Sequence, residues 1–183
     1  MKILVIGDTH GKLNKVRDIY EKLKNVDLIL HTGDHITDGI DFGSEVHVPT
    51  VCVKGNCDGS MSRDDYEIVK CECGNILLTH GHMQDVNYNT QRLLYLAEEH
   101  DCIAVIYGHT HVALIDEIDG IHFVNPGSLT QPRDGSDGTY AIVRTSDDSF
   151  EASIVYYSTV MDTGRKRTQT GYIRSLIQYS DRF

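Results

Sequence analysis

Side chains that commonly bind metal ions recur beside short apolar runs in the first two thirds of the chain. In five segments an apolar run ends next to a glycine, and Asp, Asn or His stands beside that glycine. The seven candidate residues are Asp8, His10, Asp34, Asn56, His80, His109 and His111. Alternate side chains of an extended segment point the same way, so we expect Asp8 and His10 to face one point. The same spacing relates His109 to His111.

The number and type of these side chains predict a dinuclear metal centre. Seven ligands are too many for one zinc ion, which usually takes four. They suit two ions about 3.5–4 Å apart with one bridging carboxylate. Because the set mixes carboxylates with imidazoles, it favours divalent transition metals over Ca²⁺. We expect Mn²⁺, with Ni, Fe, Co and Zn as alternatives.

The charge of such a centre indicates an anionic substrate. Two divalent ions, two carboxylates and one bridging hydroxide leave a formal charge of about +1. This charge complements a phosphodiester monoanion and would also attract a phosphomonoester. Metal ions lower the pKa of bound water and stabilise charge on a transferring phosphoryl group. We therefore expect a metal-dependent phosphoesterase, with a small phosphodiester as the favoured substrate.

The elements that position these residues can be predicted from apolar periodicity. We expect strands at residues 2–7, 28–30 and 46–53, and an amphipathic helix at 12–24. A hairpin at 66–71 and 75–79, a helix at 90–100 and five strands follow, at 102–107, 112–115, 121–124, 140–145 and 150–157. Residues 37–43, 60–65 and 131–138 are expected as loops around the site. The pattern predicts an α/β fold of mixed sheets with helices outside, in which the ends of parallel strands converge.

Length and composition bound the class of protein. The chain has 183 residues, which suits one domain; we place that domain at residues 1–157 and a C-terminal extension at 158–183. The extension is expected to be surface-packed or flexible, with a docking or oligomer-forming segment as the alternative. A formal net charge of −10 argues against stable nucleic-acid binding.

Two further features concern the location of the chain. No apolar run approaches the roughly 18 residues needed to cross a bilayer, so no membrane segment is expected. The five cysteines, without an export signal, indicate reduced thiols and a cytoplasmic protein. We interpret Cys52 and Cys102 as packing residues. Cys71 and Cys73 are interpreted as ordinary thiols of a hairpin, because no partner pair stands at zinc spacing.

Taken together, the segments resemble the metallophosphoesterase, or calcineurin-like phosphoesterase, superfamily. Its blocks run Asp-x-His, Gly-Asp, Gly-Asn-His-Asp/Glu, His and Gly-His-x-His. The segments that are similar to its compact branch are Gly55-Asn56-Cys57-Asp58, Gly108-His109-Thr110-His111 and Asn125-Pro126-Gly127-Ser128. That branch contains small bacterial and archaeal phosphodiesterases and the retromer subunit that shares their fold. The resemblance implies a sandwich of two mixed β-sheets flanked by helices.

The resemblance also implies roles for the candidate residues. One metal would be held by Asp8, His10, Asp34 and His111, with Asp34 bridging. The second would be completed by Asn56, His80 and His109. It further implies direct attack on phosphorus by a hydroxide bound to the metals, without a covalent intermediate. The Asn125–Ser128 turn would lie at the floor of the site and orient ligands.

One position departs from the family pattern. Many members have a His after the Gly-Asn pair that assists the leaving group, and here that position is Cys57. A thiol is a weaker acid catalyst at neutral pH and carries no positive charge, which puts the cleavage of poor leaving groups in doubt. Asp58 and His82 are alternative acids, although we favour a turn cap and an outer histidine. Arg133 is interpreted as a solvated loop residue rather than a phosphate contact.

Two rival functions stay open at this point. The first is a non-catalytic binding scaffold with a silent site, as in the retromer-like relatives; those relatives have lost ligands, whereas all seven positions are intact here. The second is a nuclease, for which the site would suffice but for which no extended basic groove is visible. The C-terminal extension at residues 158–183 and the ten tyrosines make a homodimer plausible.

Overall fold

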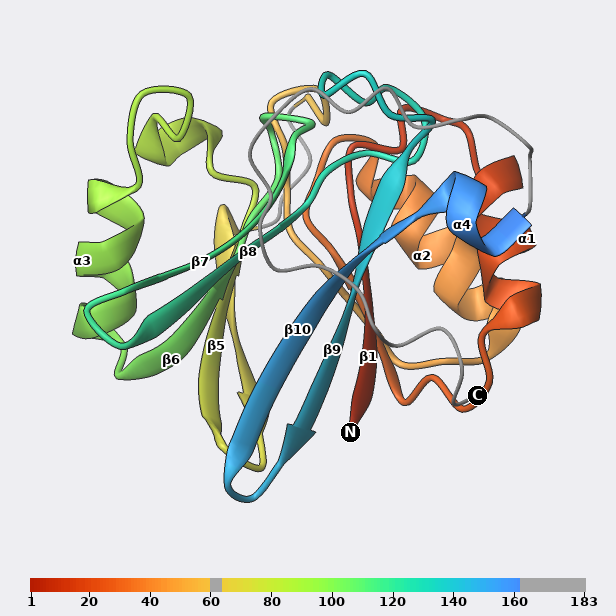
Figure 1. Ribbon diagram of the computed structural model, residues 1–183. Helices are drawn as coiled ribbons and strands as arrows, with labels where there is room; N and C mark the ends of the chain where they lie inside the picture. The colour runs from red at the N-terminus through yellow and green to blue at the C-terminus, as the bar shows by residue number, and fades with distance from the viewer. Residues whose placement is uncertain (60–63, 162–183) are drawn as a thin grey trace.

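The fold is a sandwich of two five-stranded mixed sheets, as the sequence predicts. The computed structural model describes residues 1–59 and 64–161. The first sheet has the order β10-β9-β1-β2-β3 and the second the order β4-β5-β6-β8-β7. Figure 1 shows α1, α2 and α4 beside the first sheet and α3 on the far side of the second. The molecule therefore has four layers, with helices outside and sheets inside.

The first sheet combines a parallel half with an antiparallel half. Strands β1, β2 and β3 run parallel, and β9 pairs antiparallel with both β1 and β10. Its strands are β1 (Lys2–Ile6), β2 (Leu28–His31), β3 (Thr50–Cys52), β9 (Thr139–Ser146) and β10 (Ser149–Tyr156). In the second sheet β5, β6 and β8 are parallel, with β4 and β7 as antiparallel edges. Its strands are β4 (Tyr66–Cys71), β5 (Gly74–Thr79), β6 (Cys102–Ile106), β7 (Ala113–Ile118) and β8 (Ile121–Pro126).

Alternation along the central strands divides the core into layers. In β1, Ile3 and Val5 belong to the cluster between the two sheets, whereas Leu4 and Ile6 pack in the cluster under the helices. All four are essentially inaccessible to water. Successive side chains of a strand point to opposite faces, so a strand covered on both sides must be apolar throughout. This explains why the run at residues 3–6 shows no polar alternation.

The helix α2 (Ile36–Val46) corrects two expectations. Residues 37–43 are helical and not a loop, and the strand expected at 46–53 shrinks to β3 because Val46 still belongs to α2. The glycines of α2 lower helix propensity and concealed the helix in the sequence. They are needed for packing: a Cβ on Gly39 would lie 2.8 Å from both the Cys52 sulfur and the His31 Cβ. Gly39 therefore lets α2 lie directly on β2 and β3.

Two other helices lie close to their predicted places, α1 (Asn14–Lys22) and α3 (Gln91–Glu99). The 3₁₀ turn η1 (His82–Gln84) and the short helix α4 (Tyr157–Met161) were not predicted. Val16 and Ile19 bury the apolar face of α1. The domain boundary expected after residue 157 falls inside α4, while residues 60–63 and 162–183, including most of the expected extension, lie outside the described residues. Within 1–59 and 64–161, no helix is long and apolar enough to span a bilayer.

The parallel strands of both sheets end at one edge of the sandwich. The N-terminal end of β1 lies at the bottom of Figure 1, so the carboxyl ends of the parallel strands meet at the top. The predicted site segments follow β1, β2, β3, β5 and β6 at this edge. Ligand sites in open α/β sheets form where such ends converge. The two sheets each contribute loops to the same place.

Candidate metal centre

Four acidic and imidazole side chains form a compact cluster at this edge. One ligand atom from each of Asp8, His10, Asp34 and His111 lies within 4.8 Å of the corresponding atoms of the others. Nε2 of His111 is 3.3 Å from Oδ1 of Asp8, and Nε2 of His10 is 3.3 Å from Nε2 of His111. Asp8, Asp34 and His111 are buried. The geometry therefore offers two carboxylates and two imidazoles to a single point.

A second group adjoins the first through Asp34. Its Oδ2 lies 3.8 Å from Nε2 of His10, whereas its Oδ1 lies 3.5 Å from Nε2 of His80. The same His80 nitrogen is 3.0 Å from Oδ1 of Asn56, and the rings of His80 and His109 have centroids 5.1 Å apart. The structure thus brings all seven predicted residues into one continuous cluster. The carboxylate of Asp34 lies between its two halves.

The backbone of the cluster differs from what we expected. Asp8 and His10 have φ of 51° and 48°, and His109 and His111 have φ of 68° and 58°, so neither pair is extended. These side chains converge because the chain turns through left-handed conformations. Asp, Asn and His adopt this region more readily than other residues with a Cβ, yet each such residue costs on the order of 1–3 kcal/mol. The placement of these groups therefore lowers the stability of the folded state.

Hydrogen bonds hold the strained loops in place. The Asp8 amide donates to the carbonyl of Gly33 at 3.0 Å. The Ser128 hydroxyl donates to the carbonyl of Asp8 at 2.9 Å, and the Asn125 amide donates to the carbonyl of Gly108 at 3.0 Å. The turn at residues 125–128 therefore supports the floor of the cluster through backbone contacts.

Hydrogen bonds also fix two imidazole tautomers. Nδ1 of His80 is 2.8 Å from the carbonyl of Thr32, and Nδ1 of His111 is 2.7 Å from the carbonyl of Gln131. A carbonyl only accepts, so each Nδ1 carries the proton. In the neutral ring each Nε2 then presents a lone pair to the cluster. This is the arrangement that metal-binding histidines require.

Thr9, which stands between Asp8 and His10, is held by a buried chain of hydrogen bonds. The Gly33 amide donates to Nδ1 of His31 at 3.2 Å, which leaves the proton on Nε2, 3.1 Å from the hydroxyl of Thr9. Thr9 in turn donates to Asp38 of α2 at 2.6 Å. Burial lowers the pKa of His31 to about 4, so its ring is neutral at physiological pH. This chain of hydrogen bonds anchors the segment between Asp8 and His10.

The donor set fits a divalent cation. Oδ1 of Asp8 is buried without a completed hydrogen bond, although Nε2 of His111 is nearby. An ionised oxygen without a donor is costly in the interior, and a cation would satisfy it. Burial lowers the pKa of His10 and His109 and so favours neutral rings. Burial also lowers the pKa of His111, but the hydrogen bond and charge of Asp8 outweigh it and raise that pKa. Burial raises the pKa of Asp34, but His80 and the amide of Cys57 outweigh it and lower that pKa. A bound cation would take the place of the His111 proton beside Asp8, because metals bind neutral imidazoles and ionised carboxylates.

The residues around Cys57 have structural roles. The Cys57 amide donates to Oδ1 of Asp34 at 2.8 Å, while burial and the Asp34 charge raise the pKa of its thiol to about 11. Asp58 accepts from the amides of Gly55 and Ile36, each at 2.8 Å, which confirms its interpretation as a cap. Cys52 and Cys102 are buried, as predicted.

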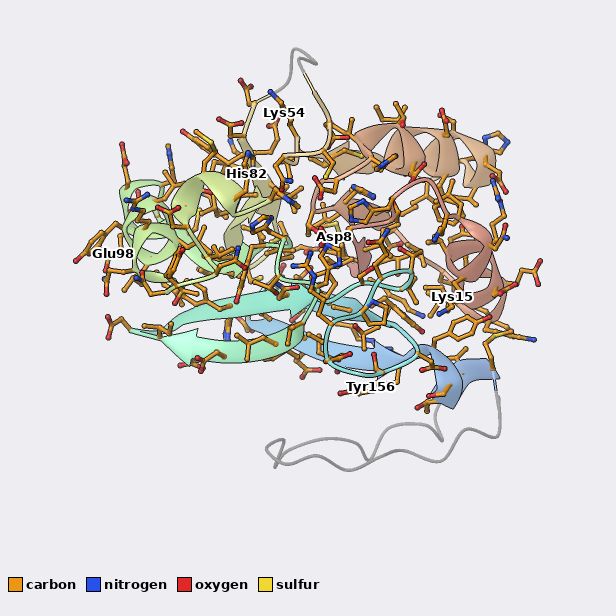
Figure 2. The ribbon with its side chains drawn as sticks, turned by 90° about the horizontal axis from the view of Figure 1, so that it is seen from above. Asp8, Lys15, Lys54, His82, Glu98 and Tyr156 are labelled. Carbon is orange, nitrogen blue, oxygen red and sulfur yellow. The ribbon has the colours of Figure 1, made fainter. Side chains whose placement is uncertain are left out.

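Two polar residues outside the predicted set adjoin the cluster. The ring of His82 lies 5.2 Å from His80 and 6.2 Å from His109, and its buried Nδ1 has no partner among the described residues. The Asn87 amide group is 2.9 Å from Nε2 of His109. Asn87 follows η1 in an irregular segment, so no pattern in the sequence singles it out. Figure 2 shows Asp8 near the middle of this edge, with His82 and Lys15 on opposite sides.

Comparisons with known proteins decide the family. Residues 1–148 match the family model described as the calcineurin-like phosphoesterase superfamily domain. The chain belongs to the calcineurin-like phosphoesterase superfamily. Membership in this superfamily implies divalent metal ions, in agreement with the cluster of Asp8, His10, Asp34 and His111.

Individual superfamily members resemble the chain over most of its length. The probable metallophosphoesterase YsnB of Bacillus subtilis is 30% identical over 158 residues, which is 86% of this chain and 90% of YsnB. The structure of a predicted phosphoesterase from Streptococcus pneumoniae superposes with a TM-score of 0.72 at 31% identity, covering 86% of this chain and 90% of that one. An archaeal phosphodiesterase superposes with a TM-score of 0.67 at 25% identity, covering 85% of this chain and 100% of that one. This superfamily member is therefore a hydrolase by family.

Proposed function

We propose that the chain is a phosphodiesterase with a two-metal centre that hydrolyses small phosphodiesters. The observation that carries the proposal is the position of Asp34. Its two carboxylate oxygens face different imidazoles, with Oδ2 3.8 Å from His10 and Oδ1 3.5 Å from His80. A carboxylate divided in this way can bridge two ions about 3.5–4 Å apart.

The proposal assigns each predicted residue to one of two ions. Asp8, His10, Asp34 and His111 would hold the first, and Asn56, His80 and His109, with the shared Asp34, would hold the second. Mn²⁺ is the ion we expect, with Ni, Fe, Co or Zn as alternatives, because carboxylate, amide and imidazole ligands suit all of them. When bound, the two ions supply a nucleophile from water at neutral pH and positive charge for the phosphoryl oxygens.

The chain's own groups set the conditions for this chemistry. The carbonyls of Thr32 and Gln131 keep the Nε2 lone pairs of His80 and His111 directed inward. His80 and the amide of Cys57 lower the pKa of Asp34 against the effect of burial, and the amide also orients the carboxylate. With two carboxylates among the ligands, the loaded centre stays cationic enough to attract a phosphodiester monoanion. The overall charge of −10 would disfavour long nucleic acids as substrates.

Cys57 supplies neither a positive charge nor an effective acid to stabilise the leaving group. With a pKa of about 11 its thiol stays protonated and neutral at physiological pH. Loss of a general acid typically lowers the rate by about 10²–10⁴-fold when the leaving group is basic. The proposal therefore expects fast hydrolysis of aryl diesters and slow hydrolysis of alkyl diesters.

The experiment is hydrolysis of bis(p-nitrophenyl) phosphate by chelator-treated protein with Mn²⁺ added back. Asp34→Asn should lower turnover more than about 100-fold, beyond the range for residues that only support ligands. It should also reduce the amount of bound Mn²⁺. Asp41→Asn, at an exposed position of α2, is the matched control and should behave as wild type.

Two outcomes would contradict the proposal. Unaltered activity of Asp34→Asn would refute the bridging role. Metal binding without turnover in Mn²⁺, Ni²⁺ or Zn²⁺ would instead favour the non-catalytic scaffold.

A further inference from the structure

A groove separates the edge strand β4 from the η1–α3 segment. It is an open groove with a volume of about 790 Å³. Its walls combine acidic and apolar side chains, namely Asp64, Asp65, Tyr66, Glu67, Ile68, Met83, Gln84 and Leu96. Within residues 1–59 and 64–161, strand β4 pairs only with β5 and so forms an edge of the second sheet. The groove is separate from the seven residues of the proposed metal centre.

The η1–α3 segment, which contributes Met83 and Leu96 to the groove, also carries exposed apolar side chains. Met83, Tyr88 and Tyr95 are 58%, 87% and 61% exposed, and all three come from η1, α3 and the segment between them. Figure 1 shows this part standing apart from α1, α2 and α4. An apolar patch rimmed by charge marks a contact surface more often than a random surface does. The chemistry of the groove specifies a partner that is cationic and partly apolar.

The chain contains a segment of that chemistry. Residues 162–183 carry five cationic and two acidic residues, a net charge of +3, which leaves −13 on residues 1–161. Three of the cations are consecutive, at Arg165, Lys166 and Arg167. We call residues 162–183 the tail. Its charge is opposite to that of the rest of the chain and to that of Asp64, Asp65 and Glu67.

The tail also contains apolar residues that stand close together in the sequence. Four apolar residues, Tyr172, Ile173, Leu176 and Ile177, fall within six consecutive positions. Burying such side chains against a second surface removes apolar area from water and is favourable. The family match ends at residue 148, and the whole archaeal phosphodiesterase maps onto 85% of this chain. The tail therefore lies beyond the part of the chain that the family model matches.

The tail is long enough to reach the groove from α4. Its 22 residues span up to about 70 Å when extended. A domain of this size has a radius of gyration of roughly 15 Å, so its diameter is about 40 Å. A path around the molecule from Met161 to β4 is therefore within reach.

We propose that the tail docks onto its own chain in the β4–α3 groove. Its Arg-Lys-Arg run lies beside Asp64, Asp65 and Glu67, and its apolar residues cover Ile68, Met83 and Leu96. The groove shares a wall with the metal centre, because Thr79, the residue before His80, donates to the carbonyl of Asp65 at 2.9 Å. A docked tail thus borders the centre without supplying a ligand. The proposal does not rest on the proposed phosphodiesterase activity.

The test is zero-length carbodiimide cross-linking of the full chain, followed by mass spectrometry. Lys166 is the only lysine of the tail. The expected result is an amide bond between Lys166 and Asp64, Asp65 or Glu67 in a product with the mass of one chain. The variant Asp64→Asn/Asp65→Asn/Glu67→Gln should lose this product. The variant Asp147→Asn/Asp148→Asn, which changes two exposed acids of the turn between β9 and β10, should keep it.

A second measurement does not depend on cross-linking chemistry. In full-length protein with Arg165→Glu, Lys166→Glu and Arg167→Glu, hydrogen exchange at η1 and α3 should be faster than in wild type, while exchange in β1 stays unchanged. Unchanged exchange at η1 and α3 would overturn the proposal. Lys166 products spread evenly over acids of the whole surface would overturn it as well. Groove products found only at the mass of two chains would show that the tail binds a second copy, which also refutes docking within one chain.

Discussion

Replacing Gly55 by alanine tests the position of Asp34 without touching any proposed ligand. A Cβ at position 55 would lie 2.3 Å from both the amide nitrogen and Oδ1 of Asp34. Ordinary contacts of this kind begin near 3.4 Å. The Asp34 carboxylate or its backbone must therefore move by about 1 Å. Such a shift would stretch the 2.8 Å hydrogen bond from the Cys57 amide beyond bonding distance.

The magnitude follows from crowding and from the displaced carboxylate. Overpacking in a tight interior costs about 1–3 kcal/mol, and for a domain of this size each kcal/mol lowers Tm by roughly 2–4 °C. The affinity for Mn²⁺ should fall at least about 10- to 100-fold, as when a supporting residue of a metal ligand is removed. The two effects are measured by thermal unfolding of the metal-free protein and by titration calorimetry with Mn²⁺.

Gly59→Ala is the matched control for Gly55→Ala. It lies four residues further on, at φ 61°, and its Cβ would meet nothing within 4 Å. Left-handed alanine costs about 1–2 kcal/mol, so Gly59→Ala should lower Tm but leave Mn²⁺ binding unchanged. If Gly55→Ala binds Mn²⁺ as tightly as Gly59→Ala does, the metal centre does not depend on the position of Asp34 and our reasoning is refuted.

Two further predictions concern pH and metal removal. His31 has a folded pKa of about 4, against about 6.5 when unfolded, so as pH falls through this window the unfolded chain takes up a proton first. The free energy of unfolding of the metal-free protein should therefore drop by about 3 kcal/mol from this group between pH 6.5 and pH 4. Urea titrations should show a shallower pH dependence for His31→Gln, and equal slopes in the two proteins would contradict the prediction. Mn²⁺ at 100 times its Kd should stabilise the protein by about 2.7 kcal/mol, which raises Tm by roughly 5–10 °C. A chelator should reverse this rise in Tm, and Asp34→Asn should abolish it. If Mn²⁺ leaves the Tm of the wild-type protein unchanged, the cluster binds no metal.

The positions of most strands and the convergence of the candidate residues were predictable because they follow from apolar runs. Each buried strand is a short uninterrupted run, and the parallel strands deliver the residues that follow them to one edge. The arrangement of the strands into two packed sheets was predicted from the family resemblance and not from the apolar runs. The helix α2 was not predictable from propensity, because Gly39 and Gly43 disfavour a helix and are present for close packing.

Local geometry within the site was harder to predict. We expected extended segments at residues 8–10 and 109–111, but left-handed turns place the side chains there. The hydrogen bonds that hold those turns come from residues 128 and 130, more than a hundred positions away from Asp8. No local pattern encodes such contacts. For the same reason Asn87 beside His109 escaped notice.

The proposed ligands come from both sheets, which has a consequence for folding. Asp8 and Asp34 follow β1 and β2 of one sheet, whereas His80 and His111 follow β5 and β6 of the other. A shared ion would act as a reversible cross-link between the two halves of the sandwich. Its affinity would then report on packing at a distance: shortening Val5 or Ile106 in the layer between the sheets would weaken metal binding without altering a ligand. Any separation of the two sheets would, in turn, favour release of the ion, because it would pull the ligands apart.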